Sequence, residues 1–301
     1  MKAKYIVGID VGGTKIRVGL VSPSGKIISS LRVPTEAKKG PAVVLKNVID
    51  ATSKVWQKNV AGIGVGMAGL VDYKKGVFLG GPNLPKELIK AKISDILKKR
   101  FKVPVKVDND VHCFTLAEAL VGAGKGKNSV FGITFGTGIG GGLVVNGRLL
   151  RGRNNAAGEI GHAVIGLGSK FKCSCGRKGH FEAFASGKAM SNIYKSLSGH
   201  VVEPKDVERL AKKGDRHAKE TLRIMADGIV AGITTVIDLL NPDIIVVGGG
   251  LSAVKSLWGP VLKRLHKDIS FAELRNTPVV QSKLGTDANI IGAALLFSER
   301  N

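Results

Sequence analysis

Two of the three cysteines in the 301-residue chain lie close in sequence to two of its six histidines. The four residues are His162, Cys173, Cys175 and His180, all within one short segment. Zinc prefers thiolate and imidazole ligands in a closed tetrahedron, and this segment holds four such groups. We therefore expect a structural zinc ion here. The alternative is that Cys173 and Cys175 are incidental loop cysteines.

Two carboxylates accompany the zinc segment: Glu159 precedes it and Glu182 follows it. Both are ligand-like, but four other ligands already complete the metal site. A zinc ion would thus brace the loop that carries them and shape a pocket.

A third chemically active group stands at 108–110, where the sequence reads Asp-Asn-Asp between a predicted strand at 103–107 and a predicted helix at 111–121. A carboxylate such as Asp110 can accept a proton from a hydroxyl that the neighbouring Asn109 helps to orient. Asp110 is equally suited to cap the helix, and the local pattern alone favours capping.

A glycine turn joins the first two predicted strands, at 5–10 and 16–21. Gly12 and Gly13 leave backbone N–H groups open to an approaching phosphate, directly after Asp10 at the strand end. The alternative is a plain glycine hairpin in which Asp10 is only a cap.

The same arrangement recurs later in the chain. A strand at 129–135, a glycine turn at 136–141 and a strand at 142–146 are followed by an Asn-Gly hairpin, as the first pair is followed by a turn and a strand at 27–33. The repeat distance of about 125 residues indicates an internal duplication. We expect the second glycine turn to be a second phosphate loop.

Two dinucleotide-type patterns, G-x-G-x-x-G at 64–69 and at 136–141, are not followed by the helix that a Rossmann site needs. No G-x-x-x-x-G-K-[ST] is present either, which excludes a P-loop protein.

Hydrophobic periodicity predicts the remaining elements. Helices are expected at 41–58, 89–101, 183–197, 207–213, 216–240 and 288–296, with another beginning at Leu251, and strands at 60–66, 243–247 and 279–281.

Composition excludes several classes of protein. A hydrophobic content of 44% over 301 residues supports two folded domains. The longest apolar run, near 244–249, is too short to span a membrane, and the N-terminus lacks a signal-peptide core. With three cysteines no disulfide framework is implied. We expect a cytoplasmic protein with no membrane partner.

The formal net charge of +23 is typical of proteins that bind polyanions. The basic residues are nevertheless dispersed, and aromatic residues make up only 5% of the chain. We do not expect nucleic acid as a partner, and a lysine-rich proteome is the alternative explanation of the charge.

Residues 158–162 (GEIGH) and 173–182 (CSCGRKGHFE) resemble the G-E-x-G-H and C-x-C-G-x-x-G-C-x-E motifs of the ROK family (repressor, open reading frame, kinase). The third zinc cysteine of that family is His180 here, so a Cys2His2 site would replace a Cys3His site. Residues 10–15 (DVGGTK) are similar to the first phosphate motif of the actin, hexokinase and Hsp70 superfamily.

The resemblance implies an α/β, two-domain ribonuclease-H-like fold of the actin/hexokinase type, with duplicated mixed β-sheet units and an interdomain cleft. It implies an N-terminal domain at 1–110, onto which a C-terminal helix at 288–301 packs back. The second domain would cover 111–287 and contain the zinc loop at 162–182.

The resemblance also implies a hexose kinase that uses ATP, Mg²⁺ and a structural Zn²⁺. Asp110 would be the catalytic base for the 6-hydroxyl of the sugar, Asp10 would hold the magnesium ion, and His162 would bridge sugar and zinc. The implied sugar-binding residues are Gly66, Asn83, Asn109, Asp110, Glu159, His162 and Glu182. The implied nucleotide-binding residues are Asp10, Gly12, Gly13, Thr14, Lys15, Gly136, Thr137, Gly138, Gly248, Gly249 and Gly250, the last three for the adenosine.

Glucose is the expected sugar, and N-acetylmannosamine, N-acetylglucosamine, fructose and allose are the alternatives. ATP is the expected donor, although Lys125 and Lys127 would suit a polyphosphate donor. The family also contains sugar-responsive regulators with an N-terminal DNA-binding domain, but only nine residues precede Asp10 here. A homodimer or homotetramer is typical of the family.

Overall fold

The computed structural model describes residues 4–269 and 271–299, so residues 300 and 301 of the expected closing segment lie outside the described residues. The strands are β1 (Tyr5–Val11), β2 (Lys15–Val21), β3 (Ile27–Pro34), β4 (Val60–Met67), β5 (Leu70–Asp72), β6 (Val77–Gly80), β7 (Val105–Asn109), β8 (Ser129–Phe135), β9 (Ile139–Val145), β10 (Arg148–Leu149), β11 (Ile244–Gly248) and β12 (Val279–Gln281). The α-helices are α1 (Pro41–Val55), α2 (Ile93–Phe101), α3 (Asp110–Leu120), α4 (Glu182–Ala185), α5 (Gly187–Ser198), α6 (Pro204–Lys212), α7 (Arg216–Leu240), α8 (Lys255–Asp268) and α9 (Ala288–Leu295).

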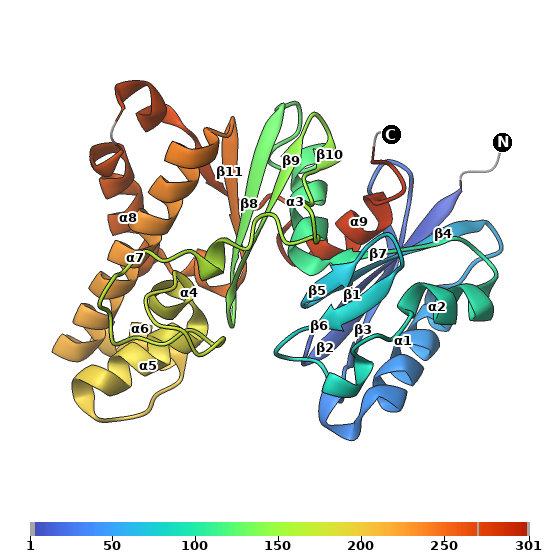
Figure 1. The fold of residues 1–301 in the computed structure, drawn as a ribbon, viewed down its shortest axis with the longest axis horizontal. Helices are drawn as coiled ribbons and strands as arrows, with labels where there is room; N and C mark the ends of the chain where they lie inside the picture. The colour runs from blue at the N-terminus through green and yellow to red at the C-terminus, as the bar shows by residue number, and fades with distance from the viewer. Residues whose placement is uncertain (1–3, 270, 300–301) are drawn as a thin grey trace. The chain divides into compact units, whose positions relative to one another are not determined.

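Two five-stranded sheets repeat one topology (Figure 1). The first has the order β3-β2-β1-β4-β7 and the second the order β10-β9-β8-β11-β12. In each, a meander of three consecutive strands is extended by two later strands. In the first sheet the meander is antiparallel, whereas β4 and β7 add in parallel. The expected duplication is confirmed.

One glycine of β1 and the alternate glycines of β4 let a helix lie directly on the first sheet. A Cβ added at Gly8 would come within 2.0 Å of the Ile290 carbonyl oxygen, and one at Gly64 within 1.7 Å of the Ala293 carbonyl oxygen, both in α9. Residues between these glycines, such as Ile9 and Val65, point to the opposite face and belong to the core that α1 covers. The glycine pattern at 62–66 therefore serves helix packing.

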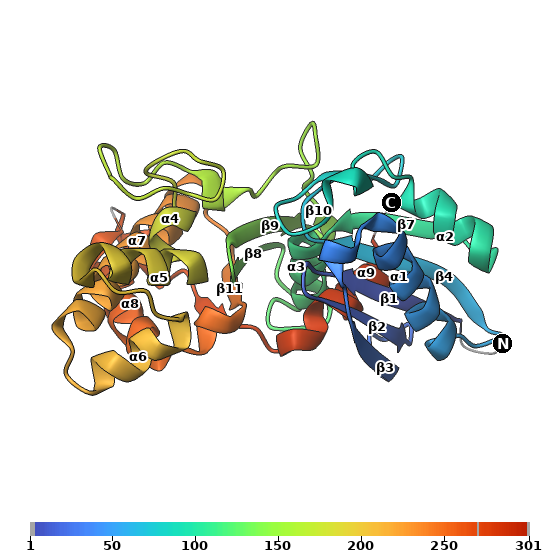
Figure 2. The ribbon, with the colours of Figure 1, turned by 90° about the horizontal axis from the view of Figure 1, so that it is seen from below.

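The chain divides into two compact units. Unit 1 comprises Met1–Gly132, Gly142–Ala157 and Ser282–Asn301, and unit 2 comprises Ile133–Gly141 and Gly158–Gln281. This division differs from a boundary at residue 110, because α3 packs along α9 and α9 packs on β1 and β4. In unit 2 the long α7 is the common neighbour of α4, α5, α6 and α8 (Figure 2).

Two helix predictions need correction. The single helix expected at 183–197 is two helices, because Ser186 is extended (φ −92°, ψ 168°) and its side chain accepts a hydrogen bond from the Ala189 N–H as the cap of α5. The helix expected from Leu251 begins as a short 3-10 turn, Gly250–Ala253, and the α-helix starts only at Lys255.

Among the described residues, none of the helices combines the length and the apolar character needed to cross a membrane.

Candidate active site and metal cluster

The carboxyl ends of three parallel strands meet in unit 1. The register of β1 and β4 pairs Asp10 with Gly66, and that of β4 and β7 pairs Gly66 with Asp108 and Met67 with Asn109. Ligands of open α/β sheets bind outside such strand ends. The structure thus brings together three of the residues on which the sequence interpretation depends, Asp10, Gly66 and Asn109.

Helix α3 begins at this edge, and its cap is Asn109. The Oδ1 atom of Asn109 accepts hydrogen bonds from the Val111 N–H at 2.7 Å and the His112 N–H at 3.1 Å, and its Nδ2 donates to the Gly69 carbonyl at 3.0 Å. Asp110 is the first residue of the helix and accepts from the Val111 N–H at 3.0 Å. The capping role that sequence pattern favours for Asp110 therefore belongs to its neighbour.

A buried ionic network lies directly beside this helix start. Asp108 faces His112 Nδ1 at 2.9 Å and accepts from Asn155 Nδ2 at 3.0 Å and Arg151 Nε at 2.8 Å. Arg151 also donates two hydrogen bonds to Glu299, at 2.7 and 2.6 Å. The charge of the buried Asp108 is thus paired with that of the half-buried Arg151.

His112 is held in its protonated form. Its Nδ1 faces the Asp108 carboxylate, and its Nε2 lies 3.0 Å from the Ala157 carbonyl, which can only accept. Burial acts to lower the pKa of His112, but the hydrogen bond and charge of Asp108 outweigh it and raise the pKa. Burial acts to raise the pKa of Asp108, and the bond and charge of His112 together with Arg151 hold it below its usual value.

The first glycine turn is closed by a hydrogen bond from the Gly12 N–H to the Lys15 carbonyl at 3.1 Å. Thr35 anchors it, because its hydroxyl donates to the Gly12 carbonyl at 2.6 Å and its N–H to the Thr14 carbonyl at 3.0 Å. A Cβ added at Gly13 would lie 2.6 Å from the carbonyl oxygen of Asn83. The turn and Asn83 are therefore neighbours in unit 1.

Asp10 has the environment of a cation ligand. Burial raises the pKa of Asp10, and the hydrogen bond from Asn289 Nδ2 at 3.3 Å and the charges of Arg17 and Lys15 oppose this only in part. A carboxylate that lacks compensation in this way fits a divalent cation, since the cation would supply the missing positive charge.

Unit 2 contains the cluster of His162, Cys173, Cys175 and His180, whose ligand atoms all lie within 4.8 Å of one another. His162 Nδ1 is 3.4 Å from His180 Nδ1 and 3.6 Å from Cys173 Sγ, and Cys175 Sγ is 3.3 Å from His180 Nδ1. With ordinary zinc bond lengths, a tetrahedral site separates two nitrogens by about 3.3 Å and a nitrogen and a sulfur by about 3.6 Å. The four residues fit a zinc ion.

Glu182 connects this cluster to the second glycine turn. Its Oε1 accepts from Cys173 Sγ at 3.2 Å and the Ser174 N–H at 3.1 Å, and its Oε2 accepts from the Ile139 N–H at 3.2 Å. Burial acts to raise the pKa of Glu182, but the bonds from Ser174 and Cys173 outweigh it and lower the pKa. Glu159 is exposed, and its carbonyl accepts from the His162 N–H at 3.0 Å.

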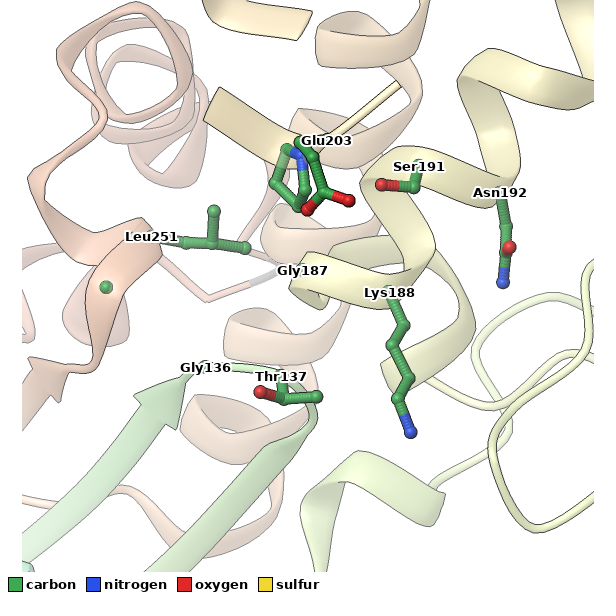
Figure 3. A pocket seen from close by; sticks show the side chains of 10 residues that line it. Gly136, Thr137, Gly187, Lys188, Ser191, Asn192, Glu203 and Leu251 are labelled. Carbon is green, nitrogen blue, oxygen red and sulfur yellow. The ribbon is translucent and has the colours of Figure 1, made fainter. Parts of the chain in front are cut away.

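A cavity of about 650 Å³ lies beside the second glycine turn (Figure 3). Figure 3 shows Gly136 and Thr137 along one side, with the Lys188 side chain extending past Thr137. The lining residues are Gly136, Thr137, Gly187, Lys188, Ser191, Asn192, Glu203, Pro204, Gly250 and Leu251. The cavity thus joins two segments that the sequence interpretation assigned to the nucleotide.

The N-terminus of α5 holds the second turn in place. The Gly187 N–H donates to the Gly136 carbonyl at 2.8 Å and the Lys188 N–H to the Thr137 carbonyl at 3.4 Å, while the Gly136 N–H donates to the Gly138 carbonyl at 2.9 Å. A Cβ added at Gly138 would lie 2.4 Å from Glu182 Oε2. The turn is therefore packed between α5 and Glu182.

The three glycines after β11 have different surroundings. Gly248 ends the buried strand, and a Cβ added at Gly249 (φ 83°) would lie 2.4 Å from the Phe135 carbonyl oxygen. A Cβ added at Gly250 meets no atom within 4 Å, and Gly250 lines the cavity. Lys125 and Lys127 are exposed in the turn after α3 and do not line this cavity.

Sequence reasoning missed two groups of residues: Asp108, His112, Arg151 and Asn155 in unit 1, and Lys188, Ser191, Asn192 and Glu203 in unit 2. A histidine in a mostly apolar helix, four residues after an aspartate, was a usable sign of the first group. The Ser-Gly pair at 186–187, which starts a helix, was a weaker sign of the second.

The chain matches the ROK family over residues 6–300. It is 33% identical to the glucokinase of Thermotoga maritima, with 98% of each chain covered. It is 31% identical to the N-acetyl-D-glucosamine kinase of Photobacterium profundum, with 96% of this chain and 98% of that protein covered. A solved structure of a ROK family glucokinase from Streptomyces griseus, in complex with glucose and AMPPNP, matches with a TM-score of 0.83 and 30% identity, covering 97% of this chain and 98% of that one.

Proposed function

The chain belongs to the ROK family, has the actin/hexokinase-type ATPase fold and is a sugar kinase, and from this premise we propose that it transfers the terminal phosphoryl group of ATP to the 6-hydroxyl of glucose. The similarity to the Thermotoga maritima glucokinase and to a glucokinase solved with glucose and AMPPNP supports this choice of substrates.

The observation that carries the mechanism is that Asn109, and not Asp110, caps α3. The Asp110 carboxylate is fixed at the first position of the helix, where its Oδ1 accepts from the Val111 N–H, and a carboxylate at this strand end is suited to take the proton of the attacking hydroxyl. Phosphoryl transfer needs an oriented nucleophile and compensated phosphate charge, and little covalent help from the protein. A general base on a fixed helix start meets the first need.

We assign contacts with the sugar to residues of both units. In unit 1 these are Gly66, Asn83, Asn109 and Asp110, and in unit 2 they are Glu159, His162 and Glu182. Both hydrogen-bonding ends of the Asn109 amide are already engaged, which leaves it one N–H for the sugar. Asn109 would thus orient the ring mainly by holding Asp110 in place.

We assign the nucleotide to the cavity beside the second glycine turn, with Gly250 next to the adenosine and Thr137 and Lys188 next to the phosphates. The Gly136 N–H is used inside the turn, so Thr137 and Gly138 are the N–H donors that this turn can offer. In unit 1, Asp10 would hold a hydrated Mg²⁺, which would neutralise phosphate charge, and Gly12 to Lys15 would add N–H groups.

We also propose that His162, Cys173, Cys175 and His180 hold a structural Zn²⁺. The ion would fix the loop that ends at Glu182, and Glu182 in turn holds the second glycine turn through the Ile139 N–H. Burial raises the pKa of the Cys173 thiol to about 12, so binding of the metal must displace a proton from it.

The test of the function is a comparison of initial rates with a panel of hexoses at saturating ATP and magnesium. Glucose is expected to give the highest kcat/KM. A second candidate is N-acetyl-D-glucosamine kinase, which the 31% identity to the Photobacterium profundum enzyme favours. A higher kcat/KM for N-acetylglucosamine, N-acetylmannosamine, fructose or allose would replace glucose as the substrate.

The donor is tested in the same assay with long-chain polyphosphate in place of ATP. ATP is expected to give the higher rate, because Gly250 leaves room for an adenosine in the cavity. A polyphosphate rate well above the ATP rate, falling steeply with salt, would instead assign the +23 charge to a polyanionic donor.

A further inference from the structure

The chain passes between the two units at four places: Gly132 to Ile133, Gly141 to Gly142, Ala157 to Gly158 and Gln281 to Ser282. These are the points at which any motion of one unit against the other must bend the backbone. The unit 1 residues at the four crossings are Gly132, Gly142, Ala157 and Ser282. All four contact, directly or through an adjacent residue, the same helix, α3.

Thr115 contacts the first two crossings. A Cβ added at Gly132 would lie 2.3 Å from Thr115 Oγ1, and one added at Gly142 would lie 2.7 Å from the same atom. Thr115 is fully buried, and its hydroxyl donates to the Val111 carbonyl at 2.8 Å, so its position is fixed within the helix. Both crossings therefore need glycine because Thr115 occupies the space beside them.

His112 and Glu118 hold the other two crossings. His112 Nε2 lies 3.0 Å from the Ala157 carbonyl, the last residue of unit 1 before Gly158. Glu118 is fully buried and accepts from Ser282 Oγ at 2.5 Å and from the N–H groups of Leu284 at 3.0 Å and Lys283 at 3.3 Å.

These three side chains follow each other at intervals of three residues and so lie along one side of α3. The opposite side of the helix is locked to unit 1, because a Cβ added at Gly292 of α9 would lie 1.7 Å from the Cys113 carbonyl oxygen. The helix begins at Asp110. A single rigid element thus carries the carboxylate assigned as the base and touches all four crossings.

We propose that α3 is the pivot of this sugar kinase, and that His112, Thr115 and Glu118 are positioning residues that set each crossing relative to Asp110. Transfer of the phosphoryl group to a sugar rather than to water requires a closure that excludes water. The closed position must also be set correctly relative to the base, Asp110. The proposal rests on the kinase activity and on the role proposed for Asp110. His112, Thr115 and Glu118 act on kcat and on closure, and we assign none of the three to the sugar or the nucleotide.

The test compares two matched threonines of unit 1. Thr115→Val places a methyl group against Gly132 and Gly142, whereas Thr52→Val makes the same change in α1, where Thr52 is also fully buried and donates to the Val48 carbonyl at 2.8 Å. Both should lose similar thermal stability. Only Thr115→Val should lower kcat, by about tenfold, with glucose affinity by calorimetry within about twofold of the wild type.

Glu118→Gln is the second variant, because an amide N–H₂ would face the N–H donors that the carboxylate now accepts. Closure is followed by small-angle scattering as the decrease in radius of gyration on adding glucose and AMPPNP. Wild type and Thr52→Val should contract alike, and Thr115→Val and Glu118→Gln should contract less.

The outcomes separate the pivot from the function. If the wild type does not phosphorylate any hexose, the proposed function fails. If the wild type is active and Thr115→Val and Glu118→Gln contract fully and turn over like Thr52→Val at equal folded fraction, α3 is not the pivot.

Discussion

The two polar clusters of this protein differ in how their charges are balanced. In unit 1, Asp108 faces His112 and Arg151, and Arg151 also faces Glu299, so two anions meet two cations. In unit 2, two histidines and two cysteines bring four lone-pair donors within 4.8 Å of one another, with no cation among them. The charges of the first cluster are matched within it, and the second has the donor set that zinc prefers.

The difference separates structural from ligand-binding roles. The Asp108 network has no unmatched charge for a ligand, so we interpret it as the support for β7, α3 and the segment up to Ala157. In contrast, burial raises the pKa of Asp10 in unit 1, and the cluster of unit 2 brings four metal-ligating groups together. Groups of this kind are typical of functional sites.

The largest effect on kcat is expected at Asp110, which lies next to the first cluster. Asp110→Asn should lower kcat by about 10²–10⁴ because it removes the general base, while glucose affinity stays within about tenfold. The matched control is Asp95→Asn, since Asp95 is an exposed carboxylate in the first turn of α2, as Asp110 is in the first turn of α3. Turnover and calorimetric glucose binding are measured for both variants. An Asp110→Asn enzyme with unchanged turnover would show that Asp110 is not the general base and has only a structural role at the start of α3.

The second cluster should depend on metal. We expect about one zinc per chain, and Cys175→Ala should lose the ion and lower activity by about tenfold to a hundredfold, because Glu182 then lacks a fixed loop. His180→Cys should keep the ion, as thiolate is also a zinc ligand. Elemental analysis and rate measurements on the same samples check both expectations.

Cys113→Ala is the control, because Cys113 is buried in unit 1 and is not part of the cluster. Metal-free protein with full activity would contradict the zinc proposal and leave the segment as a glycine-rich loop. The comparison between the two clusters would then lose its physical basis.

Most of the fold was predictable from local pattern, because β4 alternates buried apolar residues with glycine and the turns contain glycine where the chain reverses. The cluster of His162, Cys173, Cys175 and His180 was predictable because these residues are near each other in sequence. The partners of Asp108 were not, since Arg151, Asn155 and Glu299 meet it only through tertiary packing. The cap of α3 was misassigned because Asn109 and Asp110 are both good caps, and only backbone geometry distinguishes them.

The paired charges of His112 and Asp108 also predict how the free energy of unfolding depends on pH. The folded pKa of His112 is raised, so its stabilising effect is complete below the unfolded value of about 6.5 and is lost as pH rises through the folded pKa. The folded pKa of Asp108 is lowered, so its effect is complete above about 3.9 and is lost at lower pH. Unfolding free energy should therefore fall on the alkaline side, by at most about 1.4 kcal/mol per pH unit from His112.

The measurement is denaturant unfolding of the wild type and His112→Gln between pH 5 and 9. The difference between the two should shrink as pH rises, because the variant lacks the group that loses its proton. A constant difference across this range would mean that His112 is not held as an imidazolium by Asp108 and the Ala157 carbonyl.

The smallest kinetic effect is expected at Lys188, in the cavity of unit 2 to which we assign the nucleotide. Lys188 is exposed and lines the cavity beside Thr137 (Figure 3). It also lines a smaller cavity of about 190 Å³ next to Cys173 and Glu182. An exposed lysine that contacts phosphate is worth little in water, so Lys188→Ala should raise the KM for ATP by only about twofold to fivefold and leave the KM for glucose unchanged. Lys195→Ala, near the other end of α5, should change neither value. Steady-state kinetics at low and high salt check this, because a contact between exposed charges weakens as salt rises. An equal rise in both KM values would mean that Lys188 stabilises the helix rather than the phosphates, and the nucleotide would then depend on the backbone of the second turn alone.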